Sequence, residues 1–159
     1  MRNFGLLLSL IITAVSFAQD LPIGVSSTDL VGWWPFNGNA QDQSINLNNG
    51  DVYDATLTTD RFNIIDAAYS FNGNDNDVIV INPSSSLDLL LNDFTISFWF
   101  YPTQNSVSCV VDRDICQYND DWSFQWSTFG EPNITFRTDD DLYTSSNLSL
   151  DTWHHVLAV

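Results

Sequence analysis

The sequence predicts an all-β protein, with the strands arranged as a sandwich of two sheets or as a barrel. Hydrophobic residues repeat with a period of two, the pattern of strands that bury one face. Turn-forming Asn and Gly residues recur between these runs, and no window carries the apolar stripe of a long amphipathic helix. Many short strands joined by tight turns are typical of sandwiches and barrels.

The clearest strand is expected at 94–102, where Pro102 closes the run. Its even-numbered residues, Phe94 to Phe100, are apolar and predict a buried face. Its odd-numbered residues predict an outer face that carries aromatic rings. Further strands are expected within 30–39, 68–74, 122–126, 134–137 and 153–159, together with a strand buried on both sides at 78–81 and a capped helical turn within 84–91.

Three Asn-Gly pairs predict tight turns, because both residues tolerate positive φ angles at little steric cost. They are Asn37-Gly38, Asn49-Gly50 and Asn72-Gly73. The tetrapeptide Phe-Asn-Gly-Asn occurs at 36–39 and again at 71–74, but its flanks do not match. We interpret these as two similar turns and not as a duplicated unit.

The first 18 residues have the features of a secretory signal peptide. Arg2 precedes an apolar run, and Ser16-Phe17-Ala18 provides small residues for cleavage. The alternative is a membrane anchor, but the run is shorter than the roughly 20 residues that span a bilayer. We therefore expect a secreted, extracellular or cell-surface protein with no membrane span after cleavage, a short linker at 19–28 and one domain at 29–159.

The charge excludes two classes of partner. The chain has 20 acidic and four basic residues and a formal net charge of −16. Beyond the leader only Arg61, Arg113 and Arg137 are basic, and they are scattered, whereas nucleic acids and anionic membranes need clustered Lys or Arg. Hydrophobic residues make up 44% of the chain, which argues against disorder. The excess of carboxylates favours divalent cations.

The ordered segments together resemble a known family. Val31 to Ala40, Gln41 to Gly50, Ala67 to Gly73, Phe94 to Pro102 and Trp153 to Val156 follow one another as in the bacterial laminin G-like domain of the concanavalin A-like lectin and glucanase superfamily. The resemblance implies a jelly roll of two antiparallel sheets. In such domains further strands follow the Trp-His-His-Val motif, so we expect the domain to be truncated, with C-terminal strands missing after Val159.

The superfamily implies several functions, because its members include lectins, adhesion modules, calcium-dependent binders and glycoside hydrolases. We expect a non-catalytic module that binds a carbohydrate, or another extracellular surface ligand such as a protein, in cell adhesion. The alternatives are an accessory domain or fragment of a secreted polysaccharide hydrolase, and a structural adhesin spacer. Hydrolysis needs two facing carboxylates, and Glu131 is the one Glu of the chain while Asp112 and Asp114 lie in a predicted loop.

Two oxygen-rich segments are candidates for Ca²⁺, which takes six to eight oxygen ligands. Similar jelly rolls build calcium sites from loops, which makes Asp42, Asn46, Asp75 and Asp77 the candidate ligands. The alternative is that these side chains form turns and keep the protein soluble.

Exposed aromatic rings are the usual platform for a sugar ring, and Trp34, Trp99, Tyr101 and Trp122 are the candidates. The alternative for each ring is packing in the core. Cys109 and Cys116 flank a predicted turn, so in a secreted chain we expect a disulfide between them. Zinc bound by these cysteines with His154 and His155 is disfavoured, since neighbouring strand residues point to opposite faces.

Overall fold

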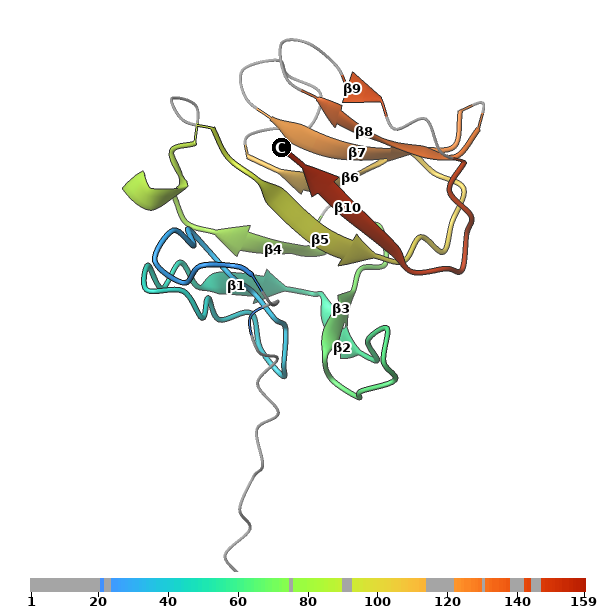
Figure 1. The fold of residues 1–159 in the computed structure, drawn as a ribbon. Helices are drawn as coiled ribbons and strands as arrows, with labels where there is room; N and C mark the ends of the chain where they lie inside the picture. The colour runs from blue at the N-terminus through green and yellow to red at the C-terminus, as the bar shows by residue number, and fades with distance from the viewer. Residues whose placement is uncertain are drawn as a thin grey trace, which may run out of the picture. The chain divides into compact units, whose positions relative to one another are not determined.

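In the computed structural model of the chain, shown in Figure 1, short β-strands joined by loops make up the regular secondary structure of the described residues, apart from one 3-10 turn. The structure describes residues 21, 24–74, 76–89, 93–113, 122–129, 131–137, 142–143 and 147–159. The strands are β1 Gly50–Tyr53, β2 Thr56–Thr58, β3 Ala68–Ser70, β4 Val78–Ile81, β5 Ile96–Phe100, β6 Ser108–Asp112, β7 Ser123–Ser127, β8 Asn133–Arg137, β9 Leu142–Tyr143 and β10 His154–Ala158, with one 3-10 turn, η1, at Ser85–Leu87. The all-β class predicted from the sequence is confirmed.

The chain divides into two compact units. The first takes the described residues up to Ser70 together with Ile79–Ile81, and it contains the pairs β1–β4 and β2–β3. Asp60 shapes the turn between β2 and β3: its carboxylate accepts hydrogen bonds from the backbone N–H groups of Phe62 and Ile64, both at 2.8 Å. This buried carboxylate thereby satisfies backbone donors that the turn leaves without strand partners.

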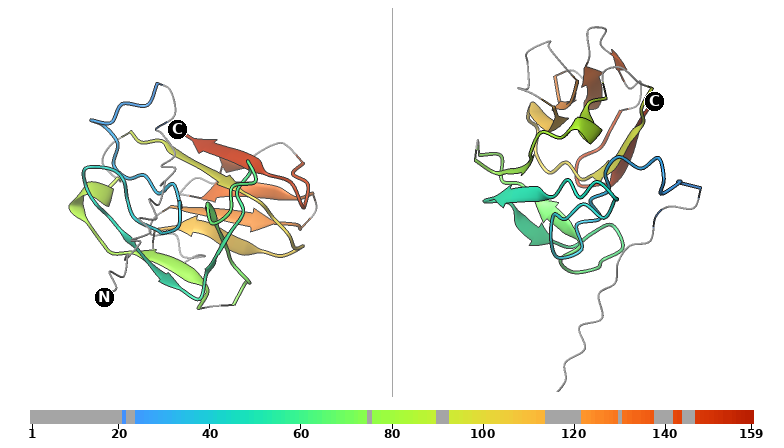
Figure 2. Two further views of the ribbon diagram at one scale, coloured as in Figure 1. Left: turned by 90° about the horizontal axis from the view of Figure 1, so that it is seen from below. Right: turned by 90° about the vertical axis from the view of Figure 1, so that its left-hand side faces the viewer.

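The second unit takes Phe71–Val78 and Asn82–Val159, and it holds two antiparallel sheets. One sheet is the pair β10–β5, and the other has the order β6–β7–β8–β9. Figure 2 shows the strands of this unit from two further directions. Two layers of antiparallel strands within one unit agree with the jelly-roll sandwich that the sequence predicts.

The core of the second unit lies between the two sheets. Phe124 and Ile134 are each 1% exposed and Val156 is 7% exposed. Aromatic rings join the layers: Phe98 of β5 meets Phe124 of β7 edge to face, with ring centroids 5.0 Å apart. Burial of each large apolar side chain stabilises the fold by about 1.5–3 kcal/mol, so these rings hold the sheets together.

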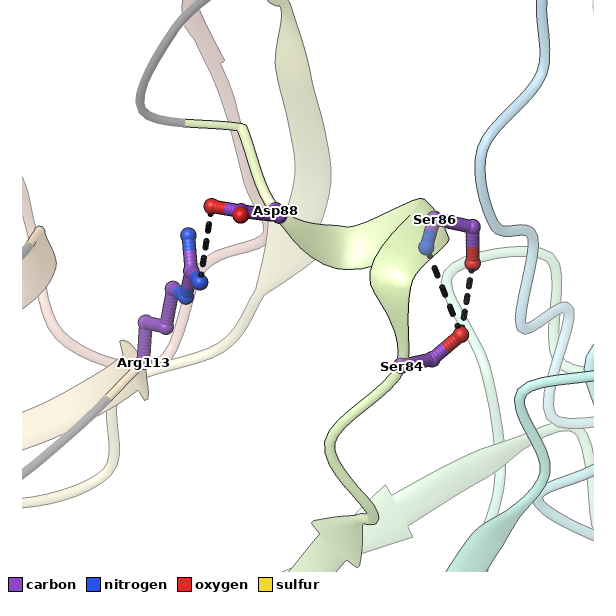
Figure 3. Close-up of polar contacts among 4 residues, drawn as sticks. All are labelled: Ser84, Ser86, Asp88 and Arg113. Carbon is purple, nitrogen blue, oxygen red and sulfur yellow. Dashed lines mark hydrogen bonds and ion pairs between the residues drawn. The ribbon is translucent and has the colours of Figure 1, made fainter.

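The turn η1 leads from β4 towards β5, and Figure 3 shows its polar contacts. The hydroxyl oxygen of Ser84 accepts a hydrogen bond from the backbone N–H of Ser86 at 3.4 Å and caps the turn. Arg113, just after β6, forms an ion pair with Asp88 at 3.2 Å. The capped turn predicted within 84–91 is confirmed over Ser85–Leu87, while residues 90 and 91 lie outside the described part of the chain.

Several predictions for single elements were right. β5 alternates as expected, with half-buried Ile96, Phe98 and Phe100 on the inner face and exposed Trp99 on the other. Strands are present at 122–126 and 134–137 with shifts of one residue. Gly38 and Gly73 have φ of 76° and 82°, the left-handed geometry expected of tight Asn-Gly turns.

Three expectations for single elements were wrong. Residues 30–39 form no strand, because the backbone of Trp33 bonds to the loop that follows and not to another strand. β4 is not buried on both sides, since Val78 and Val80 are 39% and 41% exposed. Gly50 opens β1 and has no positive φ, so Asn49-Gly50 is a strand entry and not a left-handed turn.

Candidate functional site

Strands β5 and β10 pair in a register that places aromatic side chains opposite one another. Figure 1 shows the two strands side by side. Across the pair, His155 lies opposite Trp99 and Leu157 lies opposite Ser97. Because side chains alternate along a strand, these residues share the face of the sheet opposite to Phe98 and Val156. Trp99 is 44% exposed, Tyr101 41% and Leu157 59%, so an apolar surface remains open to solvent.

Two ring pairs stand on this surface. The rings of Trp99 and His155 stack with centroids 4.9 Å apart at 26°, and those of Tyr101 and Trp153 lie 5.4 Å apart at 59°. Ser97 fixes the imidazole, because its hydroxyl lies 2.8 Å from Nε2 of His155. We call Ser97, Trp99, Tyr101, Trp153 and His155 the outer aromatic face.

The outer aromatic face contains two of the four rings predicted as ligand contacts, Trp99 and Tyr101. Sequence reasoning left out Trp153 and His155. Their alternation with Val156 was visible in the sequence, but the partner strand was not. Only the register His155 to Trp99 shows that the two aromatic rows meet.

Trp122 lies elsewhere. It is half-buried and packs against Phe94 and Phe124, with ring centroids 6.2 Å from each. These contacts join it to the apolar residues around the core. Its assignment as a ligand contact stays a prediction, and its packing in the second unit favours the alternative of a core residue.

Trp34 belongs to the first unit and is half-buried. Its indole Nε1 donates a hydrogen bond to the carbonyl oxygen of Asn48 at 2.8 Å, and its ring covers Gly32 so closely that a side chain there has no room. The ring therefore has a structural contribution, because it ties the segment before Pro35 to the Asn-rich loop, and its assignment as a ligand contact stays a prediction.

Asp42 is the centre of that loop. Its carboxylate is 2% exposed and accepts four hydrogen bonds at 2.8 Å: Oδ1 from the N–H groups of Trp33 and Ser44, and Oδ2 from the N–H of Asn48 and the hydroxyl of Ser44. Burial raises the pKa of Asp42, but these hydrogen bonds lower it by more, so its pKa lies below its ordinary value. Both oxygens are used to organise the loop.

The other predicted calcium ligands have different environments. The amide of Asn46 donates to the carbonyl oxygen of Val31 at 2.9 Å, in the same unit as Asp42. Asp77 belongs to the second unit and is 7% exposed; its Oδ2 accepts a hydrogen bond from the N–H of Asn72, whereas its buried Oδ1 has no hydrogen-bond partner among the described residues. Asp75 lies outside the described residues.

An oxygen such as Oδ1 of Asp77 is the kind of atom that a cation or a water would satisfy. No three His, Cys, Asp or Glu side chains gather as a possible metal centre anywhere in the described ranges. Calcium also uses amide and backbone oxygens as ligands.

The predicted disulfide is only partly within the described chain. Cys109 lies in β6, beside an irregularity in its register with β7 between Cys109 and Val111. Cys116 lies outside the described residues, so the pairing stays a prediction. Asp114 of the weighed acidic pair also lies outside them, and Glu131 is exposed.

The fold defines the class of protein: an antiparallel β-sandwich domain that carries exposed aromatic side chains on one sheet. Residues 72–159, more than half of the chain, match the family model of the concanavalin A-like lectin/glucanases superfamily. The chain belongs to this superfamily, and the predicted laminin G-like resemblance is confirmed. No curated protein and no solved structure gave a match. In the described part of the chain, no helix has the length and apolar character needed to cross a membrane.

Proposed function

We propose that the chain is a secreted, non-catalytic module that binds a carbohydrate through its outer aromatic face, as part of cell-surface adhesion. Membership of a superfamily that contains lectins supports a ligand-binding module. The observation that carries the proposal is the solvent exposure of Trp99 and Tyr101 beside His155 and Trp153 on one sheet face.

The chemistry of such a face suits a sugar. A pyranose presents an apolar face of C–H groups, and an aromatic ring provides a flat apolar surface with a negatively polarised face. Ser97 and His155 add a hydroxyl and an imidazole nitrogen at the edge of the rings, where hydroxyl groups of a ligand can exchange hydrogen bonds with them. Trp and Tyr also dominate the binding energy of many interfaces, since they bury large areas with few rotatable bonds.

The charge narrows the ligand class. A formal net charge of −16 repels sulfated or uronic-acid polymers at low ionic strength. The proposal therefore favours neutral glycans over anionic ones. An extracellular protein ligand would use the same face but would have to cover a larger apolar area.

The proposal includes calcium, with Asp77 as the favoured carboxylate. Asp42 already accepts four hydrogen bonds, whereas Oδ1 of Asp77 is buried without a partner in the described chain. Amide and backbone oxygens of the loop 72–77 are further donors suited to this cation. When bound, Ca²⁺ would neutralise the carboxylate and hold this loop in one conformation.

Secretion and the Cys109–Cys116 disulfide complete the proposal, supported by the apolar leader at 4–15 and by the short spacing of the two cysteines. Both are checked on protein exported from cells. The N-terminal residue of the exported chain reports cleavage after residue 18, and thiol titration under denaturing, non-reducing conditions reports the disulfide. A free thiol content of two per chain would contradict the disulfide.

The binding experiment is a glycan array probed with the exported chain, with and without a calcium chelator. Trp99→Ala and Tyr101→Ala should each weaken binding about thirtyfold or more, the effect of losing a hot-spot contact of about 2 kcal/mol. Phe129→Ala is the matched control, because Phe129 is an equally aromatic residue of the second unit that is 84% exposed and lies outside the outer aromatic face.

Each outcome decides one part of the proposal. Equal glycan binding by Trp99→Ala and Phe129→Ala would mean that the binding site lies outside the outer aromatic face. Absence of signal on every glycan would remove the carbohydrate and leave a protein ligand or a structural spacer. If Asp77→Asn binds glycan as the parent does and the chelator has no effect on either, calcium has no part in binding.

A further inference from the structure

The three Asn-Gly pairs share one sequence but differ in their hydrogen bonds. Asn-Gly is chemically labile, since glycine leaves its backbone nitrogen unshielded beside the asparagine side chain. The nitrogen must be free of other bonds to react with that side chain. The structure therefore distinguishes pairs that the sequence makes equivalent.

Two pairs are held by hydrogen bonds. The N–H of Gly38 donates to the carbonyl oxygens of Phe36 at 2.9 Å and Asp66 at 2.7 Å. The N–H of Gly50 donates to the carbonyl oxygen of Ala40 at 2.8 Å. The side-chain oxygen of Asn49 accepts from the N–H of Asp42 at 3.1 Å, which directs this amide towards a residue far from Gly50 in sequence. Attack by either glycine nitrogen first requires these bonds to break.

Asn72-Gly73 is different. In the described chain no hydrogen bond involves the N–H of Gly73, and the space where a Cβ would stand is open. Asn72, Gly73 and Asn74 are all exposed. The side-chain oxygen of Asn72 accepts a hydrogen bond from the N–H of Asn74 at 2.9 Å. This bond holds the side-chain amide over the turn and polarises its carbonyl carbon towards nucleophilic attack.

We propose that Asn72 is a site of spontaneous deamidation and isoaspartate formation in the folded protein, selected from the three Asn-Gly pairs by its free glycine nitrogen. Solvent base removes the proton of the Gly73 amide, and the nitrogen attacks Cγ of Asn72. A five-membered succinimide forms as the Cγ–Nδ2 bond breaks and ammonia leaves. Water then adds to either succinimide carbonyl and opens the ring to aspartate or isoaspartate. The net reaction consumes one water and releases one ammonia.

The modification alters a buried neighbour. The backbone N–H of Asn72 donates a hydrogen bond to Oδ2 of Asp77. Isoaspartate inserts a methylene into the main chain between residues 72 and 73, and both products add a negative charge close to a carboxylate that is 7% exposed. The added length and charge repulsion should break the hydrogen bond between Asn72 and Asp77. This inference does not rest on the proposed binding function.

The test is peptide mapping by mass spectrometry after incubation of the whole chain in mildly alkaline buffer, folded and in concentrated urea. A hydrogen bond that must break slows attack by about two- to tenfold, and Gly38 makes two of them. In the folded chain Asn72 should therefore deamidate at least about fivefold faster than Asn37 or Asn49. In urea the three rates should converge, because the hydrogen bonds are absent.

Variants separate structure from local sequence. Asn72→Gln should remove the fast phase of ammonia release, because glutamine would have to form a six-membered ring. Asn49→Gln is the matched control and should leave that phase unchanged. Folded-state rates for Asn72 that equal those for Asn49 would overturn the proposal, and so would a preference for Asn72 that persists in urea, since that preference would belong to the sequence and not to the fold.

Discussion

Replacement of Asp42 by Asn tests whether this carboxylate organises the first unit. The two side chains have nearly the same shape, so Asp42→Asn removes charge and one acceptor without leaving a cavity. In the folded chain the carboxylate accepts four hydrogen bonds, all at 2.8 Å, at a position that is 2% exposed. An asparagine amide carries a single acceptor oxygen and cannot reproduce that pattern.

The size of the effect follows from the individual bonds. The amide oxygen can keep the bonds from the N–H groups of Trp33 and Ser44, but each loses the benefit of a charged acceptor. The Ser44 hydroxyl can reverse and accept from the new NH₂ group. The N–H of Asn48 then faces a donor and loses its hydrogen bond to residue 42. One lost charge-assisted bond is worth about 1.5–3 kcal/mol, and two weakened bonds bring the total loss to about 3–5 kcal/mol.

Urea unfolding followed by tryptophan fluorescence measures this loss, with hydrogen exchange as a local readout. The midpoint should fall by about 2 M urea. Exchange at the amides of Trp33, Ser44 and Asn48 should accelerate a hundredfold or more. Asp29→Asn, at an exposed position of the same unit, is the control and should change neither. If Asp42→Asn unfolds at the control's midpoint with its three amides still protected, the carboxylate does not hold the loop.

Three further predictions concern acid stability, the core and the surface. The folded pKa of Asp42 lies below its unfolded value, so the stabilisation by its charge is complete above the unfolded pKa of about 3.9 and is lost as the pH falls through the folded pKa. Unfolding midpoints measured between about pH 5 and pH 2.5 should therefore fall more steeply for the parent than for Asp42→Asn. Parallel curves for the two proteins would contradict this. Phe124→Ala should lower the free energy of unfolding in urea by about 3–5 kcal/mol, because Phe124 is 1% exposed and lies between Phe98 and Phe136. Phe129→Ala, at an exposed position, should change that free energy by less than about 0.5 kcal/mol. Similar losses of stability for both variants would refute the assigned core. Asp88→Asn should lower the thermal midpoint by no more than about 3 °C, since the side chain of Asp88 is 57% exposed and surface ion pairs contribute about 0–1 kcal/mol. A larger fall in a thermal scan would mean that the ion pair with Arg113 stabilises the fold as a buried pair does.

The alternation of residues 94–102 was enough to predict the inner and outer faces of β5. Successive side chains of a strand must point to opposite faces, so the pattern of Ile96, Phe98 and Phe100 is a direct geometric signal. No comparable rule covers residues 30–39. Their aromatic content favours a strand, but the hydrogen bonds of Trp33 go to Asp42 and Gln43 in the next loop. The hydrogen-bonding partners of this segment, and not its β-strand propensity, decided its conformation.

For the candidate sites too, residue type and spacing did not predict how each carboxylate is used. A carboxylate in an Asn-rich loop can hold a cation or accept backbone hydrogen bonds, and the residue types are the same in both cases. The positions of Trp33, Ser44 and Asn48 show how Asp42 is used, while Asp77 keeps one buried oxygen without a partner in the described chain. These differences depend on donors brought together by the fold, which spacing in the sequence does not encode.

The sequence by itself determined the all-β class, the aromatic outer row of β5 and the superfamily resemblance, because each depends on local periodicity or on the order of short motifs. Tertiary structure alone decided which aromatic row stands beside it. Trp153 and His155 reach Tyr101 and Trp99 only through the antiparallel register of β10 with β5, across more than fifty residues of chain. Register is set by the packing of the buried face against the opposite sheet, and so the outer aromatic face exists only once the core has formed.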